Sequence, residues 1–539
     1  MRYILGISGG FRPGNRDGAA CLIKDSEIVA AAEEERFVRI KHAPGLIPLN
    51  AIKYCLKEAN IDITSIDLLL YAGISHSDMK DRLKRCLEFN LGFSPPIELV
   101  EHHIAHAASS FFASGFEKSN IITMDLSGDS ISTLLAFGDG NKITKIKEFK
   151  RPNSIGAFYN VITQYLGFTR QSDEYKVMGL SSYGKPSHDL SWLINKTGDG
   201  YSFNTQSIVN VDGKPFPSVQ EPLYSEEFLK RFKNPRKADE KITPYHQDIA
   251  ASAQERLEDI VLHLLELLHR ETGSKNLSIA GGVGLNCVMN SRLLRSPWVE
   301  NIFIQPASGD AGLALGACLQ IASQAGKKFK GMTLAYYGPK YSNEEIEKIL
   351  KITKVSYYYH EDVSGFVAER LSKGAIVGWF QGRMEYGPRA LGSRSILADP
   401  RQKDMKDKVN MAIKFRESFR PFAPTILSEF GAEYFEDFID SPFMTLNFKA
   451  RKEKSHLIPA VVHVDGTSRV QSINRDINPR YYDMIHKFYQ ITSIPLILNT
   501  SFNIRNQPIV CTPQDAISTF FGTGMDYLAI GDFIVEKKK

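Results

Sequence analysis

The sequence has few cysteines and no long apolar run, and both absences narrow the class of protein. Its six cysteines are scattered over 539 residues and include no C-x-x-C pair, so neither a disulfide framework nor a zinc knot is expected. No uncharged apolar stretch approaches the length needed to span a bilayer. The short apolar run at the start reaches glycines too soon for a signal peptide. We therefore expect a cytoplasmic protein without a membrane partner.

The sequence also lacks a strong excess of charge of one sign. With 66 Lys and Arg against 61 Asp and Glu, the net charge is only +5. Nucleic-acid-binding domains usually carry a pronounced basic surplus, so we expect no nucleic-acid partner. At roughly 100–200 residues per domain, the chain is long enough for two or more domains.

Short apolar runs alternate with helical patterns along most of the chain. Strands are predicted at residues 3–7, 19–24 and 27–32, and a turn at Asp25-Ser26 joins the last two. Further strands are predicted at residues 68–72, 121–124, 277–279 and 302–304, and a long helix at residues 249–270. Strands that alternate with helices predict an α/β fold with a parallel or mixed sheet.

Two stretches interrupt this alternation. The polar stretch from about residue 187 to 243 is rich in Asn, Asp, Gly and Pro, and we interpret it as a surface excursion or partly ordered insert that could carry specificity. A second change lies at residues 326–342, where the apolar period is lost. We place a boundary there, which predicts an N-terminal domain over residues 1–337 and a C-terminal domain over residues 343–539.

The sharpest local feature is a histidine pair. His102 and His106 are four residues apart, so on a helix they share one face and could offer two imidazoles to one metal ion. The zinc-protease motif H-E-x-x-H requires Glu directly after its first His, but His103 occupies that position. An isolated pair of this spacing is often an incidental feature of helix packing, and the pair alone leaves that alternative open.

Two aspartates favour the metal interpretation. Asp125 and Asp310 each follow an apolar run, at the carboxyl end of a predicted strand, where α/β sheets place ligand groups. Two histidines and two carboxylates would form a mixed N/O site suited to a divalent or ferric metal. Asp310 could also be the N-cap of a helix that starts at Ala311, and the two roles are compatible.

Glycines and arginines mark two further candidate sites. A predicted strand ends in Gly281 and Gly282, whose bare backbone could let a nucleotide approach the start of the next helix. Tight packing of strand and helix would explain the same pattern. In the C-terminal half, basic residues alternate with Gly, Pro and Phe around Arg389, residues 414–420 and Arg469. Such side chains suit phosphate or carboxylate recognition, so a buried anion site is predicted.

Several longer motifs occur in a specific order along most of the chain. They are Glu33-Glu34-Glu35-Arg36 with Lys41-His42, His102-x-x-x-His106, Lys176-Val-Met-Gly-Leu, Ala280-Gly-Gly-Val, Gly309-Asp310-Ala-Gly, Tyr386-Gly-Pro-Arg-Ala-Leu-Gly, Lys414-x-Arg416-Glu417, Arg420-Pro-Phe-Ala-Pro and Asn499-Thr-Ser-Phe-Asn. With these motifs the sequence resembles the carbamoyltransferase family of nodulation-factor and antibiotic-tailoring enzymes, which includes O-carbamoyltransferases of tobramycin, cephamycin and ansamycin. The excursion at about residues 187–243 is the part that the resemblance does not cover.

The resemblance implies two domains and a reaction in two stages. The N-terminal domain would have an actin-like ATPase fold similar to the tRNA threonylcarbamoyltransferase, and the C-terminal α/β domain would be similar to the enzyme that makes threonylcarbamoyl-adenylate. The C-terminal site would convert carbamoyl phosphate and ATP, with Mg²⁺ as a further candidate ion, into carbamoyl-adenylate. A transition metal in the N-terminal site, iron by resemblance, would promote transfer to a hydroxyl of a small molecule, sugar or natural product.

The resemblance also implies roles for individual residues. Phosphate and the developing anion would be held by Arg389, Lys414, Arg420 and Arg469, and the nucleotide and carbamate by Arg416, Asn499, Ser501 and Asn503. The metal ligands would be His102, His106, Asp125 and Asp310. The adenylate would be bordered by Gly281, Gly282 and Asn286, with Glu174 and Lys176 close by and Lys41 near the carbamoyl group.

One position departs from the family pattern, and it concerns the acceptor. Arg16, in Gly14-Asn15-Arg16-Asp17-Gly18, stands where the family usually has a His, so the acceptor and its base are not predicted. Three alternative functions stay open: a tRNA threonylcarbamoyl-modifying enzyme, an actin-fold sugar kinase and a non-enzymatic metal- or nucleotide-binding regulator. The small basic surplus disfavours the first. The sequence is compatible with a monomer or a homodimer.

Overall fold

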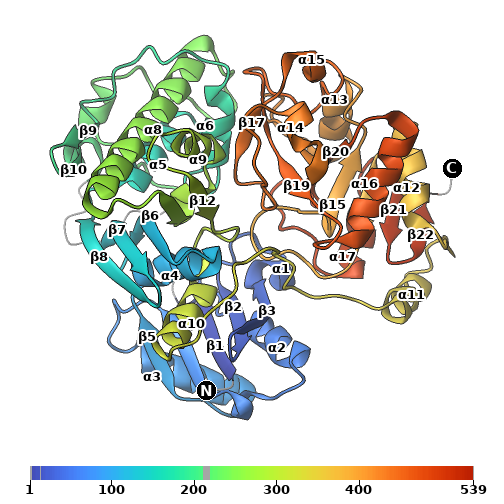
Figure 1. Ribbon diagram of the computed structural model, residues 1–539, viewed down its shortest axis with the longest axis horizontal. Coiled ribbons are helices and arrows are strands. Elements are labelled where there is room, and N and C mark those ends of the chain that lie inside the picture. The colour runs from blue at the N-terminus through green and yellow to red at the C-terminus, as the bar shows by residue number, and fades with distance from the viewer. Residues whose placement is uncertain (1–2, 12–13, 210–218, 538–539) are drawn as a thin grey trace. The chain divides into compact units, whose positions relative to one another are not determined.

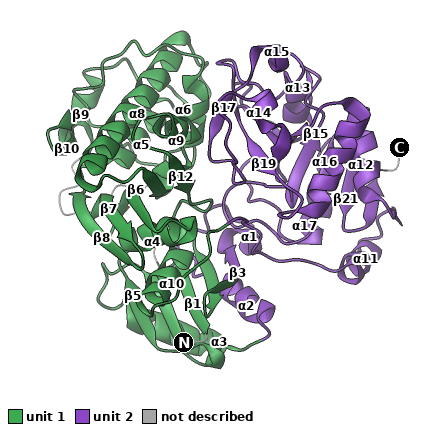
Figure 2. Ribbon diagram, in the orientation of Figure 1, with its two compact units in different colours: residues 1–28, 61–332 green, residues 29–60, 333–539 purple. Residues whose placement is uncertain are grey.

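The computed structural model describes residues 3–11, 14–209 and 219–537, which form two compact units (Figures 1 and 2). Unit 1 comprises residues 1–28 and 61–332, and unit 2 comprises residues 29–60 and 333–539. A segment near the start of the sequence therefore belongs to the same unit as the C-terminal part of the chain. Within the described ranges, every helix is too short or too polar to cross a membrane.

Two five-stranded sheets in unit 1 share one strand order. In the first, β3-β2-β1-β4-β5, strand β1 is antiparallel to β2 and parallel to β4. In the second, β8-β7-β6-β11-β12, strand β6 is antiparallel to β7 and parallel to β11. The strands are β1 (Tyr3–Ser8), β2 (Ala19–Lys24), β3 (Glu27–Glu33, which runs into unit 2 after Ile28), β4 (Leu68–Ala72), β5 (Ile97–Val100), β6 (Lys118–Gly128), β7 (Ile131–Asp139), β8 (Lys142–Lys150), β11 (Asn276–Ala280) and β12 (Asn301–Ile304). This duplicated arrangement is that of the predicted actin-like ATPase fold, which is confirmed.

The helices of unit 1 bring the metal-site segments together. They are η1 (Ile63–Ser65), α3 (Met79–Leu91), α4 (His102–Ser114), α5 (Ile155–Tyr165), α6 (Glu174–Ser181), η2 (Thr205–Ser207), α7 (Glu226–Leu229), α8 (Pro244–Thr272), η3 (Gly282–Leu285), α9 (Cys287–Leu294) and α10 (Gly312–Gln324). Helices α4 and α10 pack closely because Gly316 has no side chain: a Cβ there would lie 1.8 Å from the carbonyl oxygen of Ala105. This packing places the start of α4 beside the start of α10.

The polar excursion packs onto unit 1 where it is described. It contains the antiparallel hairpin of β9 (Ile194–Thr197) and β10 (Gly200–Phe203). The ring of Tyr201 stacks on Phe149 of β8 at 4.4 Å between centroids, and its hydroxyl lies 3.0 Å from the Thr133 hydroxyl. Aromatic contacts therefore order this part of a segment whose composition is polar. Residues 210–218 of the excursion lie outside the described residues.

Unit 2 is built on one eight-stranded mixed sheet of order β13-β22-β21-β14-β15-β20-β16-β19. Its strands are β13 (Tyr357–Tyr359), β14 (Val377–Phe380), β15 (Arg394–Ala398), β16 (Ala423–Leu427), β19 (Gln471–Ile473), β20 (Leu496–Ser501), β21 (Tyr527–Ile530) and β22 (Phe533–Glu536), with a separate pair β17 (Asn447–Lys449) and β18 (Thr467–Arg469). Its helices are α1 (Glu34–Val38), α2 (Leu49–Glu58), α11 (Asn343–Ile352), α12 (Val363–Ser372), α13 (Met405–Val409), the π-helical turn η4 (Asn410–Lys414), η5 (Ser428–Phe430), α14 (Gly431–Tyr434), α15 (Lys452–Ser455), α16 (Pro479–Thr492) and α17 (Pro513–Phe521). The α/β prediction is thus confirmed for unit 2 as well.

Residues 29–60 join unit 2 through both its core and its polar contacts. Ala32 is buried in one cluster with Met384 and Cys511. The guanidinium of Arg383 donates to the carbonyl oxygen of Val29 and to the hydroxyl of Tyr54, both at 3.0 Å. These contacts span more than 300 residues of sequence, so composition and local periodicity carry no signal of them.

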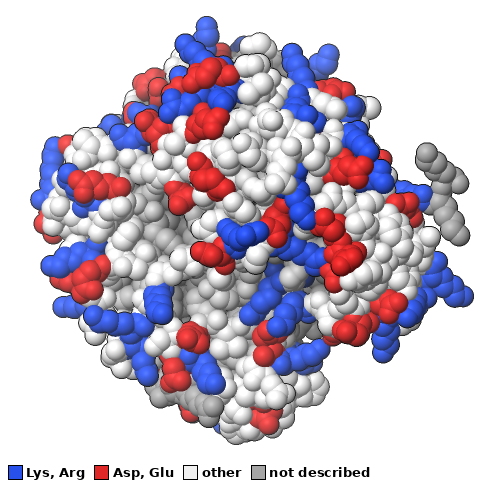
Figure 3. Space-filling view, turned by 45° about the vertical axis from the view of Figure 1, so that its right-hand side comes forward, with Lys and Arg blue, Asp and Glu red and all other residues white. Residues whose placement is uncertain are grey.

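Charged side chains of both signs share the face drawn in Figure 3. There the basic and acidic groups of the described residues are interspersed. At physiological ionic strength, exposed charges that lie more than about 8 Å apart are largely screened from one another. The small net charge of the sequence is thus matched by a mixed distribution on this face.

Candidate active site

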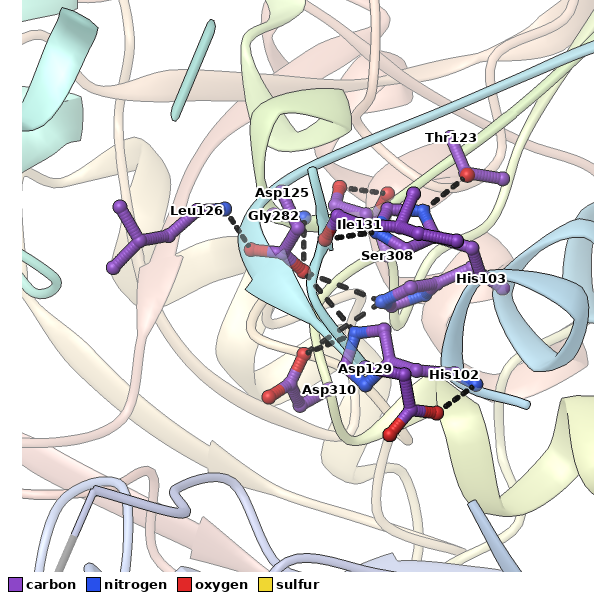
Figure 4. A network of polar contacts seen from close by, with 12 residues as sticks. His102, His103, Thr123, Asp125, Leu126, Asp129, Ile131, Gly282, Ser308 and Asp310 are labelled. Carbon is purple, nitrogen blue, oxygen red and sulfur yellow. Dashed lines mark hydrogen bonds and ion pairs between the residues drawn. The ribbon is translucent and has the colours of Figure 1, made fainter. Parts of the chain in front are cut away.

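Four predicted metal ligands converge in unit 1 (Figure 4). His102 and His106 lie one turn apart at the start of α4, Asp125 lies in β6, and Asp310 lies just before α10. The Nε2 atom of His106 is 3.2 Å from Asp125 Oδ2 and 3.6 Å from Asp310 Oδ1. The Nε2 atom of His102 is 3.9 Å and 3.7 Å from the same two oxygens. The predicted N-cap role of Asp310 is wrong, because the N-cap of α10 is Ala311, and the Asp310 carboxylate faces the histidines.

These four side chains fit a metal ion. Ligands at about 2.1 Å from one ion lie about 3.0–3.9 Å apart when their bonds subtend about 90–135° at the metal. The measured separations of 3.2–3.9 Å fall in this interval. Within the described chain, the buried Nε2 atoms of His102 and His106 make no hydrogen bond of regular geometry. Buried imidazole nitrogens with this freedom and two facing carboxylates form a donor set for a transition metal.

The charges of the cluster shift the proton affinity of its members. Burial by itself lowers the pKa of His106, but the nearby carboxylates of Asp125 and Asp310 raise it to about 9. Burial raises the pKa of Asp125, yet the two histidines hold it well below its usual value. For Asp310, burial and the neighbouring charge of Asp125 raise the pKa. The cluster therefore attracts positive charge, whether a proton or a metal ion.

His103 occupies the position at which the zinc-protease motif requires Glu, and it has a supporting role that the sequence did not reveal. Its ring is fully buried, with Nδ1 2.7 Å from the Thr123 hydroxyl and Nε2 3.0 Å from the carbonyl oxygen of Ile131. A carbonyl oxygen only accepts, so Nε2 carries the proton and Nδ1 accepts from Thr123. His103 thus ties α4 to β6 and β7. Its place between two ligands was the available signal, but only the fold names its partners.

The predicted glycine turn lies beside the cluster of His102, His106, Asp125 and Asp310. The backbone N–H of Gly282 points to Asp125 Oδ2 at 3.4 Å. The amides of Asn286 and Gln254 exchange two hydrogen bonds, of 3.0 and 2.9 Å. The Oδ1 atom of Asn286 also accepts the N–H of Met289 at the start of α9. The structure therefore brings this turn to the metal ligands, while the Asn286 amide holds α9 against α8.

Two more predicted residues lie on the short helix α6. Lys176 is buried, and its ammonium is 3.0 Å from the Asp173 carboxylate. The carboxylate of Glu174 accepts the N–H of Gln171, whose carbonyl oxygen accepts from Arg16 at 3.3 Å. Arg16, the residue that departs from the family pattern, is therefore held next to the turn that precedes α6.

Lys414 is the centre of the predicted anion site in unit 2. Its buried ammonium donates to the Oδ1 and carbonyl oxygens of Asn503, at 2.8 and 3.0 Å, and to the carbonyl oxygen of Ser501. Burial, followed by the charges of Arg416 and Arg420, lowers the pKa of Lys414 well below its usual value. An anion bound here would relieve this mutual repulsion of cations.

Arg416 and Arg420 lie near enough to Lys414 for their charges to act on it. The Nε atom of Arg416 donates to Asn410 at 2.9 Å, and its guanidinium lies 4.2 Å from the Phe422 ring centroid. Arg420 is 3.7 Å from the Glu417 carboxylate. Arg469 is the last residue of β18, and its charge acts on the partly buried ring of His463. Five cations, with Lys406, thus act on one another or on shared neighbours in this unit.

Arg389 lies on a loop that several buried side chains anchor. The amide of Asn499 donates to the carbonyl oxygen of Ala390 at 3.1 Å, and Gln471 donates to that of Leu391 at 2.8 Å. One oxygen of Glu385 accepts three backbone N–H groups, from Leu391, Ser393 and Arg394. Asn499, which we predicted to bind the nucleotide, therefore positions this loop, and Gln471 and Glu385 are contributors that the sequence analysis missed.

The segment 29–60 contributes a second anchor to the same loop. Glu33 accepts the N–H of Gly387 at 2.8 Å, and Arg36 donates to the carbonyl oxygen of Gly387 at 2.7 Å. Both side chains are buried and paired at 3.2 Å. Lys41 follows in the same segment and is likewise part of unit 2. The Glu-Glu-Glu-Arg motif was visible in the sequence, but its partner in the loop was not.

The family of the chain follows from comparison with known proteins. A model described as carbamoyltransferase N-terminus matches residues 3–89 and 79–319, and one described as carbamoyltransferase C-terminus matches residues 368–537. The chain belongs to the carbamoyltransferase family. It is a carbamoyltransferase enzyme with both family parts present, and the predicted resemblance is confirmed.

Relatives of this carbamoyltransferase share most of its length. It is 40% identical to the nodulation protein NolNO of Sinorhizobium fredii, over 97% of this chain and 79% of that protein. It is 38% identical to the uncharacterized protein sll1178 of Synechocystis, over 100% of this chain and 97% of that protein. Among solved structures it is similar to HypF of T. kodakarensis, at 16% identity and a TM-score of 0.33, over 61% of this chain and 48% of that one. The last likeness is too weak to inform the activity.

Proposed function

We propose that this carbamoyltransferase takes its carbamoyl group from carbamoyl phosphate, activates it with ATP as carbamoyl-adenylate, and transfers it to a hydroxyl of a small molecule, sugar or natural product. The observation that carries the proposal is the presence of two opposite charge clusters in one family member. A His/Asp cluster in unit 1 suits a metal cation, and a cluster of buried cations in unit 2 suits phosphate.

Unit 2 has the chemistry of the activation stage. Its residues 343–539, the proposed adenylate-forming domain, contain Lys414, Arg416, Arg420 and Arg469 as well as the anchored loop of Arg389. Cations held in a desolvated site stabilise the charge that develops on phosphate oxygens as a bond to phosphorus forms or breaks. Ser501 and Asn503, which contact Lys414, would orient it toward the nucleotide phosphates. Water would cleave carbamoyl phosphate to carbamate and phosphate, and a carbamate oxygen would then attack the α-phosphorus of ATP, with pyrophosphate as the leaving group.

The His/Asp cluster of unit 1, in the proposed transfer domain of residues 1–337, suits the chemistry of the second stage. His102, His106, Asp125 and Asp310 would hold the ion, with iron as the candidate. When bound, the ion would act as a Lewis acid on the carbamoyl carbonyl. The Gly281-Gly282 turn and Asn286 would border the adenylate, and Glu174 and Lys176 would line its approach. The acceptor hydroxyl would displace AMP and lose its proton.

A direct test separates this function from its alternatives. The protein is incubated with labelled carbamoyl phosphate, ATP and a panel of sugars and glycosides, and the labelled product, pyrophosphate and AMP are measured. Carbamoyl-dependent pyrophosphate release with labelled product is the expected result. ADP formation that ignores carbamoyl phosphate would instead indicate a sugar kinase. Labelled tRNA would indicate the threonylcarbamoyl-type enzyme.

A further inference from the structure

Asp129 lies in the turn between β6 and β7, beside the metal cluster (Figure 4). Its Oδ2 atom accepts the backbone N–H of His102 at 2.9 Å. Its Oδ1 atom accepts the N–H of Ile74 at 2.9 Å, the N–H of Ser75 at 2.9 Å and the hydroxyl of Ser75 at 2.6 Å. One carboxylate therefore joins the loop after β4 to the first residue of α4.

The start of α4 depends on this distant carboxylate. The N-cap of α4 is Glu101, whose side chain makes no capping hydrogen bond. The first N–H groups of any helix have no partner within the helix, and a carboxylate there also interacts favourably with the helix dipole. Asp129 supplies both interactions from another strand pair. Because the capped residue is His102 itself, this contact holds the backbone of a proposed metal ligand.

The turn that carries Asp129 is shaped for this contact. Asp129 and Ser130 have φ angles of +50° and +69°, a region that costs energy for residues with a side chain. The pairing of β6 with β7 shifts in register between Met124 and Gly128. A Cβ on Gly128 would lie 2.1 Å from Cδ2 of His102. The ring of His102 thus lies against the bare backbone of Gly128, directly before Asp129.

We propose that Asp129 is a positioning residue for the metal site, which holds His102 in place through its backbone N–H and through the loop at Ile74 and Ser75. This inference rests on the metal-binding role proposed for His102. Asp129 is not one of the four side chains whose donor atoms converge, which are His102, His106, Asp125 and Asp310. The segment from Asp125 to Asp129 therefore contributes one proposed metal ligand, Asp125, and one residue that positions another proposed ligand, Asp129.

The test is the affinity of the full-length protein for Co²⁺, read from the d–d absorption of the bound ion in competition with a chelator. In Asp129→Asn, an amide offers one acceptor where the carboxylate offers two, so at least one of four donors loses its partner. Loss of a residue that supports a ligand typically weakens metal binding about 10- to 100-fold. We expect a loss in that range together with a changed d–d spectrum, which a general loss of stability would not produce.

Asp62 offers a matched control in the same unit. Its Oδ1 atom accepts the N–H of Thr64 at 2.8 Å and also the Thr64 hydroxyl, as Asp129 does with Ser75, but at a turn that holds no ligand. Asp62→Asn should leave Co²⁺ affinity and spectrum unchanged. If Asp129→Asn does not fold, Asp129→Glu keeps the charge and moves it by one methylene, and the same loss is expected.

The outcomes separate this inference from the proposed function. A folded Asp129 variant that binds Co²⁺ within twofold of the wild type overturns the positioning role, provided that His106→Ala abolishes binding. If the wild type and His106→Ala bind Co²⁺ equally, the metal site itself is refuted, and with it this role. Equal losses in Asp129→Asn and Asp62→Asn would reduce the effect to general stability and would also overturn the proposal.

Discussion

His106 in unit 1 is buried and His463 in unit 2 is partly buried, and their surroundings move the pKa of the two imidazoles in opposite directions. In unit 1, Asp125 and Asp310 overcome the effect of burial and raise the pKa of His106 to about 9. In unit 2, burial lowers the pKa of His463 to about 4, and the charges of Arg469 and Lys406 act in the same direction against Asp465. One cluster is thus built to attract a cation and the other to attract an anion. The imidazole pKa is raised in His106 and lowered in His463. The surroundings of a histidine, and not the residue type alone, therefore set its proton affinity.

The largest effect is expected in the His/Asp cluster of unit 1. The double variant His102→Ala/His106→Ala should lose metal binding and reduce carbamoyl transfer to the background rate, because two of four ligands are gone. Carbamoyl-dependent pyrophosphate release should stay near the wild-type rate. His263→Ala is a control, since its ring forms a hydrogen bond with the carbonyl oxygen of Thr197 in the excursion. Loss of both half-reactions together would contradict a division of work between the two clusters.

The next largest effect is expected in the cation cluster of unit 2. Lys414→Met removes a buried cation that holds Ser501 and Asn503. Pyrophosphate release should fall about 10²- to 10³-fold, the usual cost of one electrostatic donor at a reacting centre. Co²⁺ affinity should be unchanged. Lys408→Met is a control on an exposed lysine that pairs with Asp404. An unchanged rate of pyrophosphate release in Lys414→Met would remove Lys414 from the activation site.

A smaller effect is expected at Asn499, which we expect to position the proposed anion site through the Arg389 loop. Asn499→Leu has a similar size but cannot donate to the carbonyl oxygen of Ala390. A slightly displaced Arg389 loop should raise the KM for carbamoyl phosphate about 10-fold and leave the KM for ATP nearly unchanged. Steady-state kinetics with each substrate varied in turn would show this split. An equal rise in both values would instead favour the predicted contact of Asn499 with the nucleotide.

The smallest effect concerns stability against pH. His463 has a pKa of about 4 in the folded protein and about 6.5 when unfolded. Between these values the unfolded chain binds more protons, so the free energy of unfolding should fall as the pH drops from about 6.5 to 4. His463→Gln should flatten this part of the profile, as measured by urea unfolding at each pH. A profile with the same slope in both proteins would show that His463 is not the responsible group.

The contrast between the clusters also marks how far sequence analysis reached. The apolar runs before Asp125 and Asp310 and the helical spacing of His102 and His106 were readable, because period and turn signals act over a few residues, although β6 continues past Asp125 to Gly128 and β12 already ends at Ile304. The side chains that hold the sites were not. Asp129 is 27 residues from His102, and Glu33 and Arg36 are more than 350 residues from Gly387 in the chain. No local pattern encodes such partners in a single sequence.

The excursion shows the same limit. Its polar composition predicted a surface segment, yet Tyr201 is buried against Phe149 and α8 receives the hairpin through His263. A few aromatic residues order a polar segment only when the fold supplies their partners. Composition averages over such residues and so underestimates the order of the segment.

The sequence by itself determined the family and the α/β class. It also identified the histidines and aspartates of the cluster in unit 1 and the lysines and arginines of the cluster in unit 2, because these features depend on local periodicity and on motifs in a fixed order. Only the tertiary structure decided that residues 29–60 belong to unit 2, that Asn499 supports a loop, and that Asp129 caps the helix of His102. The reason is physical. A buried carboxylate or amide must find its partners wherever the fold places them, and that distance in space is unrelated to distance along the chain.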